Sequence, residues 1–452
     1  MLKSIRLSVS VFGFFAAILV FPVVPAAKNL SIIRDAEIEN TIQAYAAPLF
    51  KAAGLVPSSV NIYLVKDRTL NAFVAGGQNL FIHTGLLVRS ENADQVIGVI
   101  AHETGHIAGG HLTRTNEALR NSTAQTILGA VLGVIAAVGT GRGDVGAAVI
   151  AGSQGSSIRS FLRYSRIQES VADQAAAQFL ENTGQSAHGL LEFLNILSQG
   201  EPLSTETQNS YMRSHPMSRE RIESLQTHIA KSRFSDIPSS EDFQTRHRIM
   251  RAKLLAFLEP KTIITGRYKE TDNSIESRYA RAIAYYRVPN LEKALPLVDG
   301  LIAEQPNNAY FHELKGQMLF ENGRVQEALG PYTKATELMP GSALLRLGLA
   351  RAQLESNNPA LLQLSALNFQ SALQREPRMP FAWRQLAIAY GRTNQPGMSA
   401  LALAEEALLL GNQRNALYQA GKAETLLPRG SIGWLKAQDI REAAQFLDRE
   451  KK

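Results

Sequence analysis

The sequence contains no cysteine among its 452 residues. A disulfide framework and a thiolate metal site are therefore both excluded, and any metal must be held by His, Asp or Glu. Long runs of one charge are also missing. The 47 Lys and Arg residues and the 40 Asp and Glu residues are spread along the chain. Such a mild basic excess favours solubility over nucleic-acid binding.

The first 27 residues contain no acidic residue and predict an export signal. Lys3 and Arg6 precede an apolar run from Leu7 to Val24, and "VVPAAK" offers small residues for cleavage after Ala26 or Ala27. This order of charged, apolar and small residues is typical of a secretory signal peptide. An uncleaved membrane anchor is the alternative, because the apolar run approaches the length that spans a bilayer.

The length exceeds that of a single hydrophobic core, so we expect at least two domains and an α+β, mainly α, fold. Residues 28–235 mix strand and helix patterns, and "NAFVAGGQNLFIHTGLL" predicts a strand, a Gly-Gly turn, a second strand and the start of a helix. We expect residues 236–242 to form a linker. Residues 243–452 show helical patterns with almost no strand.

The apolar, glycine-rich stretch 127–152 allows several interpretations. Its most apolar part, Ile127 to Val138, is too short to cross a bilayer. We expect a pair of small-residue helices or a mobile cover. A segment that touches a membrane is the alternative.

The C-terminal half contains a repeat. "LKGQMLFENGRVQEALGPYTKATELMP" has the offsets of a tetratricopeptide repeat, and its closing proline, Pro340, lies 34 residues after Pro306. A further repeat closes at Pro377 after a longer turn, and Trp383 to Tyr390 begin another. Because each helix pair of such a repeat buries its apolar face on its neighbours, we predict an all-α solenoid that acts as a binding module.

A metal site is predicted by "VIAHETGHIAGGHL" (Val99 to Leu112). On a helix, His102 and His106 lie four residues apart and face one side, while Glu103 points toward a water that the metal would hold. His111 is one residue too early for the longer metzincin pattern H-E-x-x-H-x-x-G-x-x-H, which would place its third histidine at position 112. A turn at the glycines before it could bring it to the metal, but we expect a supporting or surface histidine.

A third ligand is expected from "YSRIQESVADQAAAQFL". Glu169 and Asp173 lie four apart on a predicted helix whose other face consists of small and apolar residues. Glu169 would supply an oxygen ligand, and Asp173 would hold a ligand imidazole. From its local sequence, His215 in "RSHPMSRERI" is a loop histidine that could reach the metal or the reaction oxyanion. Arg221 lies on the helix that follows it.

Four motifs, "NAFVAGG", "IAHETGHIAGGH", "ESVADQAA" and "HPMSRERI", resemble in order those of the zinc metallopeptidases that include HtpX and the prenyl-protein CAAX protease. With its C-terminal repeats the chain is most similar to the periplasmic BepA type within this family. The resemblance covers nearly the whole mature chain. It implies that His102, His106 and Glu169 bind one Zn²⁺ and that Glu103 is the general base.

The resemblance also implies supporting roles. Asp173 would orient a ligand, and Arg221 is expected beside it. His215 would occupy the fourth metal position and keep the enzyme latent. The strand that contains Asn71, Ala72 and Phe73 would be an edge to which an extended substrate adds.

The predicted function is therefore that of a latent zinc endopeptidase in the periplasm, which could also assist the assembly of outer-membrane β-barrel proteins as a chaperone. Its expected substrates are misfolded or stalled envelope proteins, and the resemblance implies outer-membrane β-barrel proteins and their assembly complex as partners of the repeats. A tetratricopeptide chaperone or scaffold with a structural metal site is the alternative, in which His215 would close the site. Glu103 discriminates between the two, because a structural site needs no carboxylate beside its first ligand. A protease anchored by its N-terminal segment is a further alternative.

Overall fold

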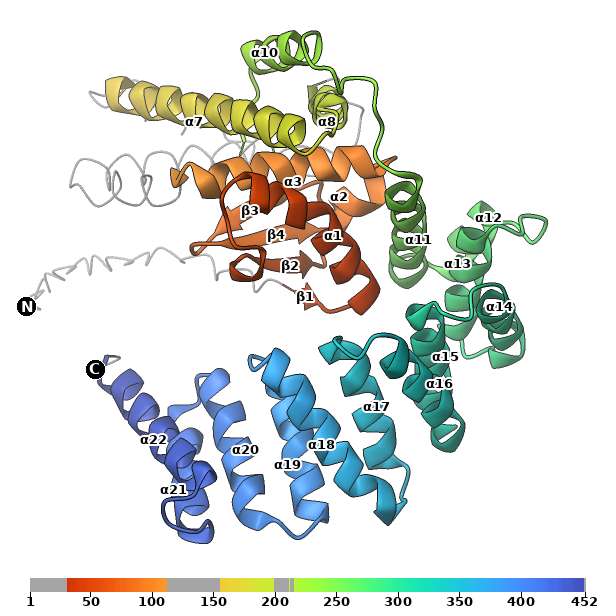
Figure 1. The fold of residues 1–452 in the computed structure, drawn as a ribbon, viewed down its shortest axis with the longest axis vertical. Coiled ribbons are helices and arrows are strands. Elements are labelled where there is room, and N and C mark those ends of the chain that lie inside the picture. Colours follow the sequence, from red (N-terminus) through yellow and green to blue (C-terminus); the bar gives the residue numbers. More distant parts are fainter. Residues whose placement is uncertain (1–30, 112–154, 199–210, 212–214, 451–452) are drawn as a thin grey trace, which may run out of the picture.

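The computed structural model describes residues 31–111, 155–198, 211 and 215–450. The predicted signal peptide and the glycine-rich stretch 127–152 lie outside these residues. Figure 1 shows a small sheet covered by helices, followed by helix pairs that curve around one side of it. This is the predicted combination of an α+β part and an all-α solenoid.

The sheet is formed by four short strands, in the order β1-β2-β4-β3. They are β1 (Ile32–Ile33), β2 (Asn61–Val65), β3 (Ala72–Ala75) and β4 (Asn79–His83). β2 and β4 are parallel, and the two outer pairs are antiparallel. Gly76 and Gly77 connect β3 to β4 with φ values of 57° and 94°, which only glycine adopts readily. The predicted strand, Gly-Gly turn and strand are confirmed, and β3 lies at an edge of the sheet.

Helices pack around this sheet and share one core with it. They are α1 (Ala36–Ala52), α2 (Thr84–Arg89), α3 (Ala93–Ala108), α7 (Gly155–Asn182), α8 (His188–Ser198), α10 (Arg219–Ile229) and α11 (Glu241–Leu258). α3 lies at the centre of this part, between the sheet and α7 and α8 (Figure 1). Its apolar residues, among them Val96, Val99 and Ile100, are fully buried. This burial, rather than helix propensity alone, holds α3 in place.

The solenoid consists of antiparallel helix pairs. After the short α12 (Lys261–Arg267), the pairs are α13 (Ile275–Tyr286) with α14 (Leu291–Glu304), α15 (Ala309–Glu321) with α16 (Val325–Leu338), α17 (Ala343–Glu355) with α18 (Pro359–Arg375), α19 (Pro380–Arg392) with α20 (Pro396–Leu409), and α21 (Gln413–Leu426) with α22 (Ile432–Glu450). A Cβ atom on Gly316 would come within 2.8 Å of the Tyr332 ring, so the glycine allows α15 and α16 to approach closely. This contact explains why the repeat pattern places a small residue there.

α11 joins the two parts. The expected linker lies outside helices and strands as far as Ser240. α11 then begins at Glu241, so the last two residues of the predicted linker are helical. Met250 and Leu254 belong to the core around the sheet, while Ile249 and Leu255 belong to the first core of the solenoid. α11 is therefore shared by both hydrophobic cores.

Ionic contacts at this junction hold the start of α1 against the solenoid. Lys253 of α11 is buried, and its Nζ lies 2.8 Å from Asp35 and 3.1 Å from Glu37. The Tyr279 hydroxyl of α13 donates a hydrogen bond to Glu37 at 2.8 Å. Because a buried ammonium needs such partners, these contacts link α1, α11 and α13 into one unit.

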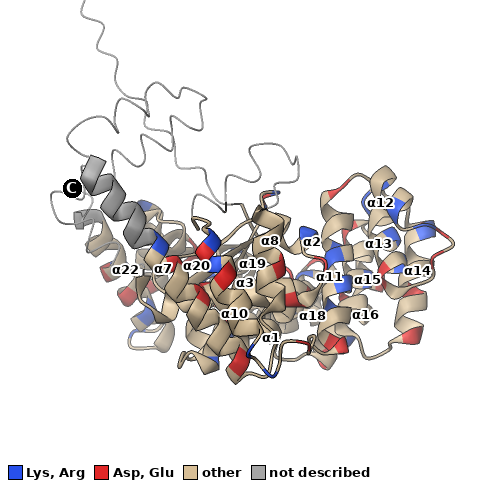
Figure 2. Ribbon diagram, turned by 90° about the horizontal axis from the view of Figure 1, so that it is seen from above, with Lys and Arg blue, Asp and Glu red and all other residues tan. Residues whose placement is uncertain are grey.

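Charged side chains are distributed over both parts of the chain. Figure 2 shows Lys and Arg interspersed with Asp and Glu along the helices. Within the residues that the structure describes, every helix is too short or too polar to span a bilayer.

Candidate metal centre

α3 carries the predicted metal motif. Asn92 caps its N-terminus by accepting a hydrogen bond from the Gln95 amide, and the helix ends at Gly109, before Gly110 turns the chain with a φ of 60°. His102 and Glu103 are fully buried, and His106 is almost so. The imidazoles of His102 and His106 offer their Nε2 atoms to the same space, 3.1 Å apart.

α7 supplies the predicted carboxylate because it approaches α3 very closely. A Cβ atom on Gly105 would lie 2.7 Å from the backbone oxygen of Ala172, so only glycine permits this contact. The approach brings Glu169 to 3.4 Å from Nε2 of both His102 and His106. The small-residue face that the sequence predicts on this helix is therefore the face that packs against the metal motif.

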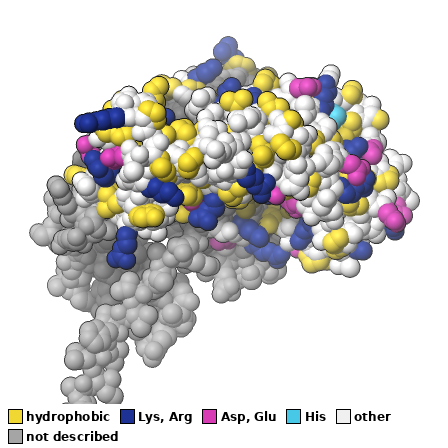
Figure 3. All heavy atoms as spheres, turned by 90° about the horizontal axis from the view of Figure 1, so that it is seen from below, with side chains coloured by type: hydrophobic (Ala, Val, Ile, Leu, Met, Phe, Trp, Pro, Cys, Tyr) yellow, Lys and Arg dark blue, Asp and Glu magenta, His cyan; other side chains and the backbone are white. Residues whose placement is uncertain are grey.

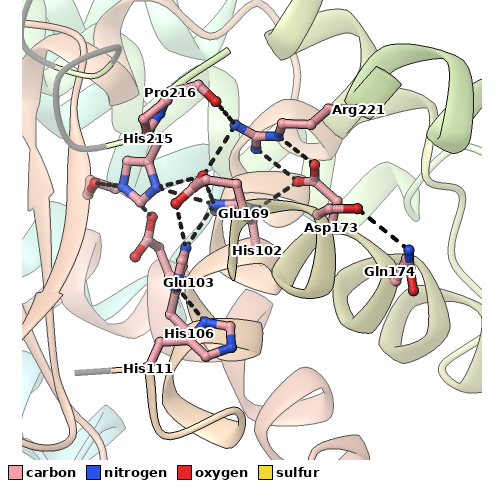
Figure 4. Close-up of polar contacts among 12 residues, drawn as sticks. His102, Glu103, His106, His111, Glu169, Asp173, Gln174, His215, Pro216 and Arg221 are labelled. Atoms are coloured by element: carbon pink, nitrogen blue, oxygen red, sulfur yellow. Dashed lines mark hydrogen bonds and ion pairs between the residues drawn. The ribbon is translucent and has the colours of Figure 1, made fainter. Parts of the chain in front are cut away.

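His215 completes the cluster, although its local sequence indicated only a loop residue. Its side chain is 4% exposed, and its Nδ1 lies 3.2 Å from both His102 Nε2 and Glu169 Oε2. One ligand atom each from His102, His106, Glu169 and His215 lie within 4.8 Å of one another. Figure 4 shows the four side chains converging from α3, α7 and the segment before α10.

Asp173 and Arg221 hold this cluster from outside. Asp173 accepts a hydrogen bond from His102 Nδ1 at 2.8 Å, which leaves Nε2 free to face the site. Arg221 contacts both oxygens of Asp173, at 2.6 and 2.9 Å, and lies 3.1 Å from Glu169. It also donates to the Pro216 carbonyl at 3.0 Å and so positions the chain next to His215. Arg221 is thus a buried bridge between two carboxylates and the histidine segment.

His111 is buried beside His106 and is not part of the four-residue cluster. The turn at Gly109 and Gly110 aims its ring at α3, and the Nδ1 atoms of His111 and His106 lie 2.9 Å apart. A Cβ atom on Gly109 would meet the His111 ring at 2.5 Å, so this glycine makes room for it. The expectation of a supporting histidine fits this position, whereas that of a surface histidine does not.

Glu103 lies next to the cluster with an unsatisfied carboxylate. It is fully buried, and both oxygens lack a hydrogen-bond partner among the described residues. Its Oε1 lies 3.3 Å from Nε2 of His215. Because burying a carboxylate without a hydrogen-bond donor is costly, the two oxygens of Glu103 are candidates for a role in the chemistry of the site.

The charges of the cluster are strongly coupled. Burial alone lowers the pKa of His102, but hydrogen bonds to Asp173 and Glu169 outweigh it and raise this pKa to about 10. Burial raises the pKa of Glu169, yet hydrogen bonds from His102, His106 and His215 lower it well below its usual range. For His106, burial dominates and lowers the pKa. The carboxylate of Glu169 is thus stabilised as an anion by the histidines around it. A bound metal cation would take over this stabilisation.

The edge strand β3 lies beside the same site. The predicted residues Ala72 and Phe73 are its first two residues, and Asn71 directly precedes it. The carbonyl oxygen of Ala72 lies 3.3 Å from Nε2 of His215. His215 therefore contacts the metal cluster through Nδ1, and Glu103 and the edge strand through Nε2.

Tyr211 is a site residue that the sequence analysis did not identify. Its ring stacks on His215, with centroids 4.5 Å apart and planes 26° apart, and it is fully buried. No local pattern marks this contact, because the position of the Tyr211 ring depends on its edge-on packing against Phe193 of α8. The four-residue spacing between Tyr211 and His215 is the only signal in the sequence.

The donor set fits a divalent metal ion. Three imidazole nitrogens and one carboxylate oxygen converge, and two imidazoles are oriented from outside by Asp173 and His111. The unsatisfied Glu103 beside this set is the arrangement of a catalytic rather than a purely structural centre.

Known proteins are similar to this sequence, some of them over most of its length. Residues 33–229 match the family model Peptidase family M48. The "Beta-barrel assembly-enhancing protease" of Escherichia coli (strain K12) is 23% identical over 89% of this chain and 82% of its own length. The protein of the same name from Yersinia pestis is 24% identical over the same shares. "Metalloprotease YcaL" of Escherichia coli (strain K12) is 27% identical over 44% of this chain and 75% of its own length.

Proposed function

We propose that this chain, whose residues 33–229 form a peptidase family M48 domain, is a zinc metalloendopeptidase of the bacterial periplasm that is latent at rest. The domain is that of a metalloendopeptidase. The metal identity, the compartment and the latency are our proposals, as is the division into a signal peptide (1–27), a peptidase domain (28–235), a linker (236–242) and a repeat domain (243–452). The observation that carries the proposal is the unsatisfied, buried Glu103 beside four converging ligand atoms.

His102, His106 and Glu169 would hold the metal ion, and Asp173 and Arg221 would orient them. A Zn²⁺ ion bound there supplies Lewis acidity, which polarises a peptide carbonyl and acidifies water. Glu103 accepts the proton of the attacking water with its free carboxylate and passes it to the leaving amine. Its burial next to the ligands keeps that carboxylate within reach of the reacting atoms.

His215 would keep the enzyme latent because it occupies three places at once: the metal site, the carboxylate of Glu103 and the carbonyl of Ala72. Its Nδ1 contacts two metal ligands, while its Nε2 lies 3.3 Å from Glu103 and 3.3 Å from the carbonyl of Ala72. An extended substrate that adds to β3 would need that carbonyl. His215 would also occupy the place beside the other three metal ligands that a water molecule would need. Displacement of His215 would therefore free all three groups together.

The names of the relatives support a role for this metalloprotease in the assembly of outer-membrane β-barrel proteins. We propose misfolded or stalled outer-membrane proteins as substrates, and the β-barrel assembly complex as a partner of the solenoid. An edge strand reads mainly the main chain, so the cleavage preference should be broad. The solenoid would then select the client.

The competing function is a tetratricopeptide chaperone or scaffold with a structural metal site. It is favoured by the four ligand atoms, which suffice to close a tetrahedral site. A structural metal site, however, would give the carboxylate of Glu103 no role.

The deciding experiment is casein digestion by the purified protein, with the metal content measured in parallel. We expect His215→Ala to cut faster than wild type, and Glu103→Gln to bind metal and not cut. His228→Ala is the matched control, because His228 lies on α10 outside the cluster and its removal should leave the rate unchanged. Metal bound in every variant with no cleavage in any would favour the structural site.

A further inference from the structure

The last repeats contain a cavity that the proposed peptide hydrolysis does not use. It has a volume of about 510 Å³ and lies between α18, α19, α20 and the start of α22. Two separate buried clusters meet there, one formed by α17 to α20 and the other by α20 to α22. The cavity is thus an unfilled space between neighbouring repeat cores, and its volume is within the range of about 300–1,000 Å³ that is common for ligand sites.

The walls of the cavity are mainly apolar. Leu373, Trp383, Leu386, Tyr390, Met398 and Leu401 line it. Aromatic rings and a methionine provide adaptable contacts for apolar groups of different shape. Such a lining suits side chains that vary from one ligand to the next.

Exposed apolar side chains are frequent in this part of the solenoid. Among the described residues twenty large hydrophobic side chains are exposed, and twelve of them lie within residues 364–447. Ile432, which lines the cavity, is 77% exposed. Figure 3 shows hydrophobic side chains interspersed with Lys and Arg over the face of the molecule seen from below. Ile432 therefore extends the apolar lining of the cavity to the surface of the protein.

Two charged groups interrupt the apolar lining. Glu405 of α20 and Lys436 of α22 both line the cavity. Burial raises the pKa of Glu405 although Lys436 opposes this shift, and neither side chain forms a salt bridge or hydrogen bond with another described residue. Besides the polar groups of Gln370, Gln374 and Tyr390, the cavity therefore offers a carboxylate acceptor and an ammonium donor. These two groups complement the N–H and C=O groups of a peptide main chain.

We propose that this cavity binds an extended apolar peptide segment of an unfolded protein, with side chains in the cavity and the main chain between Glu405 and Lys436. A fatty-acyl chain would fill the apolar part, but its hydrocarbon has no donor for Glu405. The inference deepens the proposed function, because it names how the solenoid would hold a client of the peptidase.

Trp383 provides a direct reporter. The chain has only two tryptophans, and Trp434→Phe leaves Trp383 in the cavity wall as the sole emitter. The full chain with Trp434→Phe and Glu103→Gln, which prevents cleavage, is titrated with a capped ten-residue peptide of Leu, Val, Ser and Thr. We expect a saturable blue shift of Trp383 emission.

Two lysine substitutions test the location. Ile432→Lys should weaken binding by about tenfold, because it places a charge at the cavity. Leu410→Lys is the matched control: Leu410 is also aliphatic, 61% exposed and in the same half of the solenoid, but it does not line the cavity. Its effect should stay within about twofold. A peptide N-methylated at alternate residues should bind about tenfold more weakly, because it lacks main-chain donors for Glu405.

The proposal would be overturned by the absence of a Trp383 response or by an equal loss of binding in both lysine variants. A response to lauric acid but not to the peptide would also contradict it. An emission that changes with protein dilution would show that a second copy of the chain occupies the cavity. Casein cleavage by His215→Ala is measured separately. If it occurs while the peptide does not bind, the proposed function stands and this inference fails.

Discussion

At the scale of single residues, the neighbours of each histidine decide its role. His102 and His106 both turn Nε2 toward the cluster, because Asp173 and His111 contact their Nδ1 atoms. His215 instead turns Nδ1 inward, since its Nε2 faces the carbonyl of Ala72. The three histidines thus differ in which ring nitrogen faces the cluster, because neighbouring groups contact the other nitrogen.

We predict that His111 strengthens metal binding without being a ligand. His111→Leu removes the acceptor for His106 Nδ1–H and should raise the dissociation constant for Zn²⁺ by about 10–100-fold. His111→Gln keeps an acceptor and should recover part of that loss. Competition with a chromophoric chelator at constant pH measures both values. Unchanged affinity in His111→Leu would show that the contact with His106 has no such role.

At the scale of elements, the site depends on close approach between helices. α3 carries Gly98 and Gly105 on its packed side, where added Cβ atoms would lie 2.5 Å from the Leu190 amide nitrogen and 2.7 Å from the Ala172 carbonyl. These neighbours are backbone atoms, which cannot rotate away. The separation of α3 from α7 and α8 is therefore set by glycine.

We predict that Gly105→Ala destabilises the fold by about 1–3 kcal/mol and weakens metal binding, because it forces α7 and Glu169 away from α3. Gly330→Ala is the matched control on α16, where an added Cβ meets no atom within 4 Å. It should stabilise the protein by about 0.5–1 kcal/mol through helix propensity. Urea unfolding of both variants, with metal content, tests the difference. Equal effects of the two substitutions would refute the role of close approach.

The elements themselves were largely predictable from local patterns. The Gly-Gly turn, the helix of the metal motif and the Gly316–Tyr332 repeat contact all follow from short spacings. Local patterns did not show the burial of His215 or its stacking on Tyr211, because both depend on where a loop meets distant helices. The resemblance to known metallopeptidases, not spacing, assigned His215 to the metal.

At the scale of the whole molecule, a buried ionic junction joins the solenoid to the peptidase part. Lys253 and Glu37 lie at its centre, and Arg34 forms a further salt bridge with Glu376 of the solenoid. α1 also packs against α3, which carries the metal motif. A change at the solenoid therefore has a physical path to the site through α1.

Glu313 makes this junction sensitive to pH. Burial raises the pKa of Glu313 to about 7 from an ordinary 4.5; Lys253 opposes this shift, while Asp35, Glu37 and Glu321 add to it. The folded protein thus binds this proton more tightly than the unfolded chain does. The contribution of Glu313 to stability is most favourable below pH 4.5 and is lost as the pH rises toward 7.

We predict that Glu313→Gln raises the free energy of unfolding by about 1–3 kcal/mol at pH 8 and changes it little at pH 4.5. Urea unfolding between pH 4.5 and pH 8 measures the difference. Glu442→Gln is the control, because Glu442 is exposed on α22. A constant difference between Glu313→Gln and wild type across this range would contradict the coupling.

The sequence by itself determined the chemistry and the elements of this protein. The absence of cysteine limited the donors to nitrogen and oxygen, and the spacing of His102, Glu103 and His106 placed three functional groups on one helix. Both conclusions rest on residue type and helical period, which are local properties.

Only the tertiary structure decided which distant groups meet. Glu169, Asp173, His215 and Arg221 are brought to α3 by helix packing, and Lys253 is enclosed by three elements from both parts. A local pattern can suggest a partner, as it did for Glu169 and Asp173. The distance between the groups depends on the summed packing of the whole chain. The physical reason is that the spacing of residues fixes the side of one helix on which each side chain lies. The distance between two helices depends on the side chains of both helices where they pack.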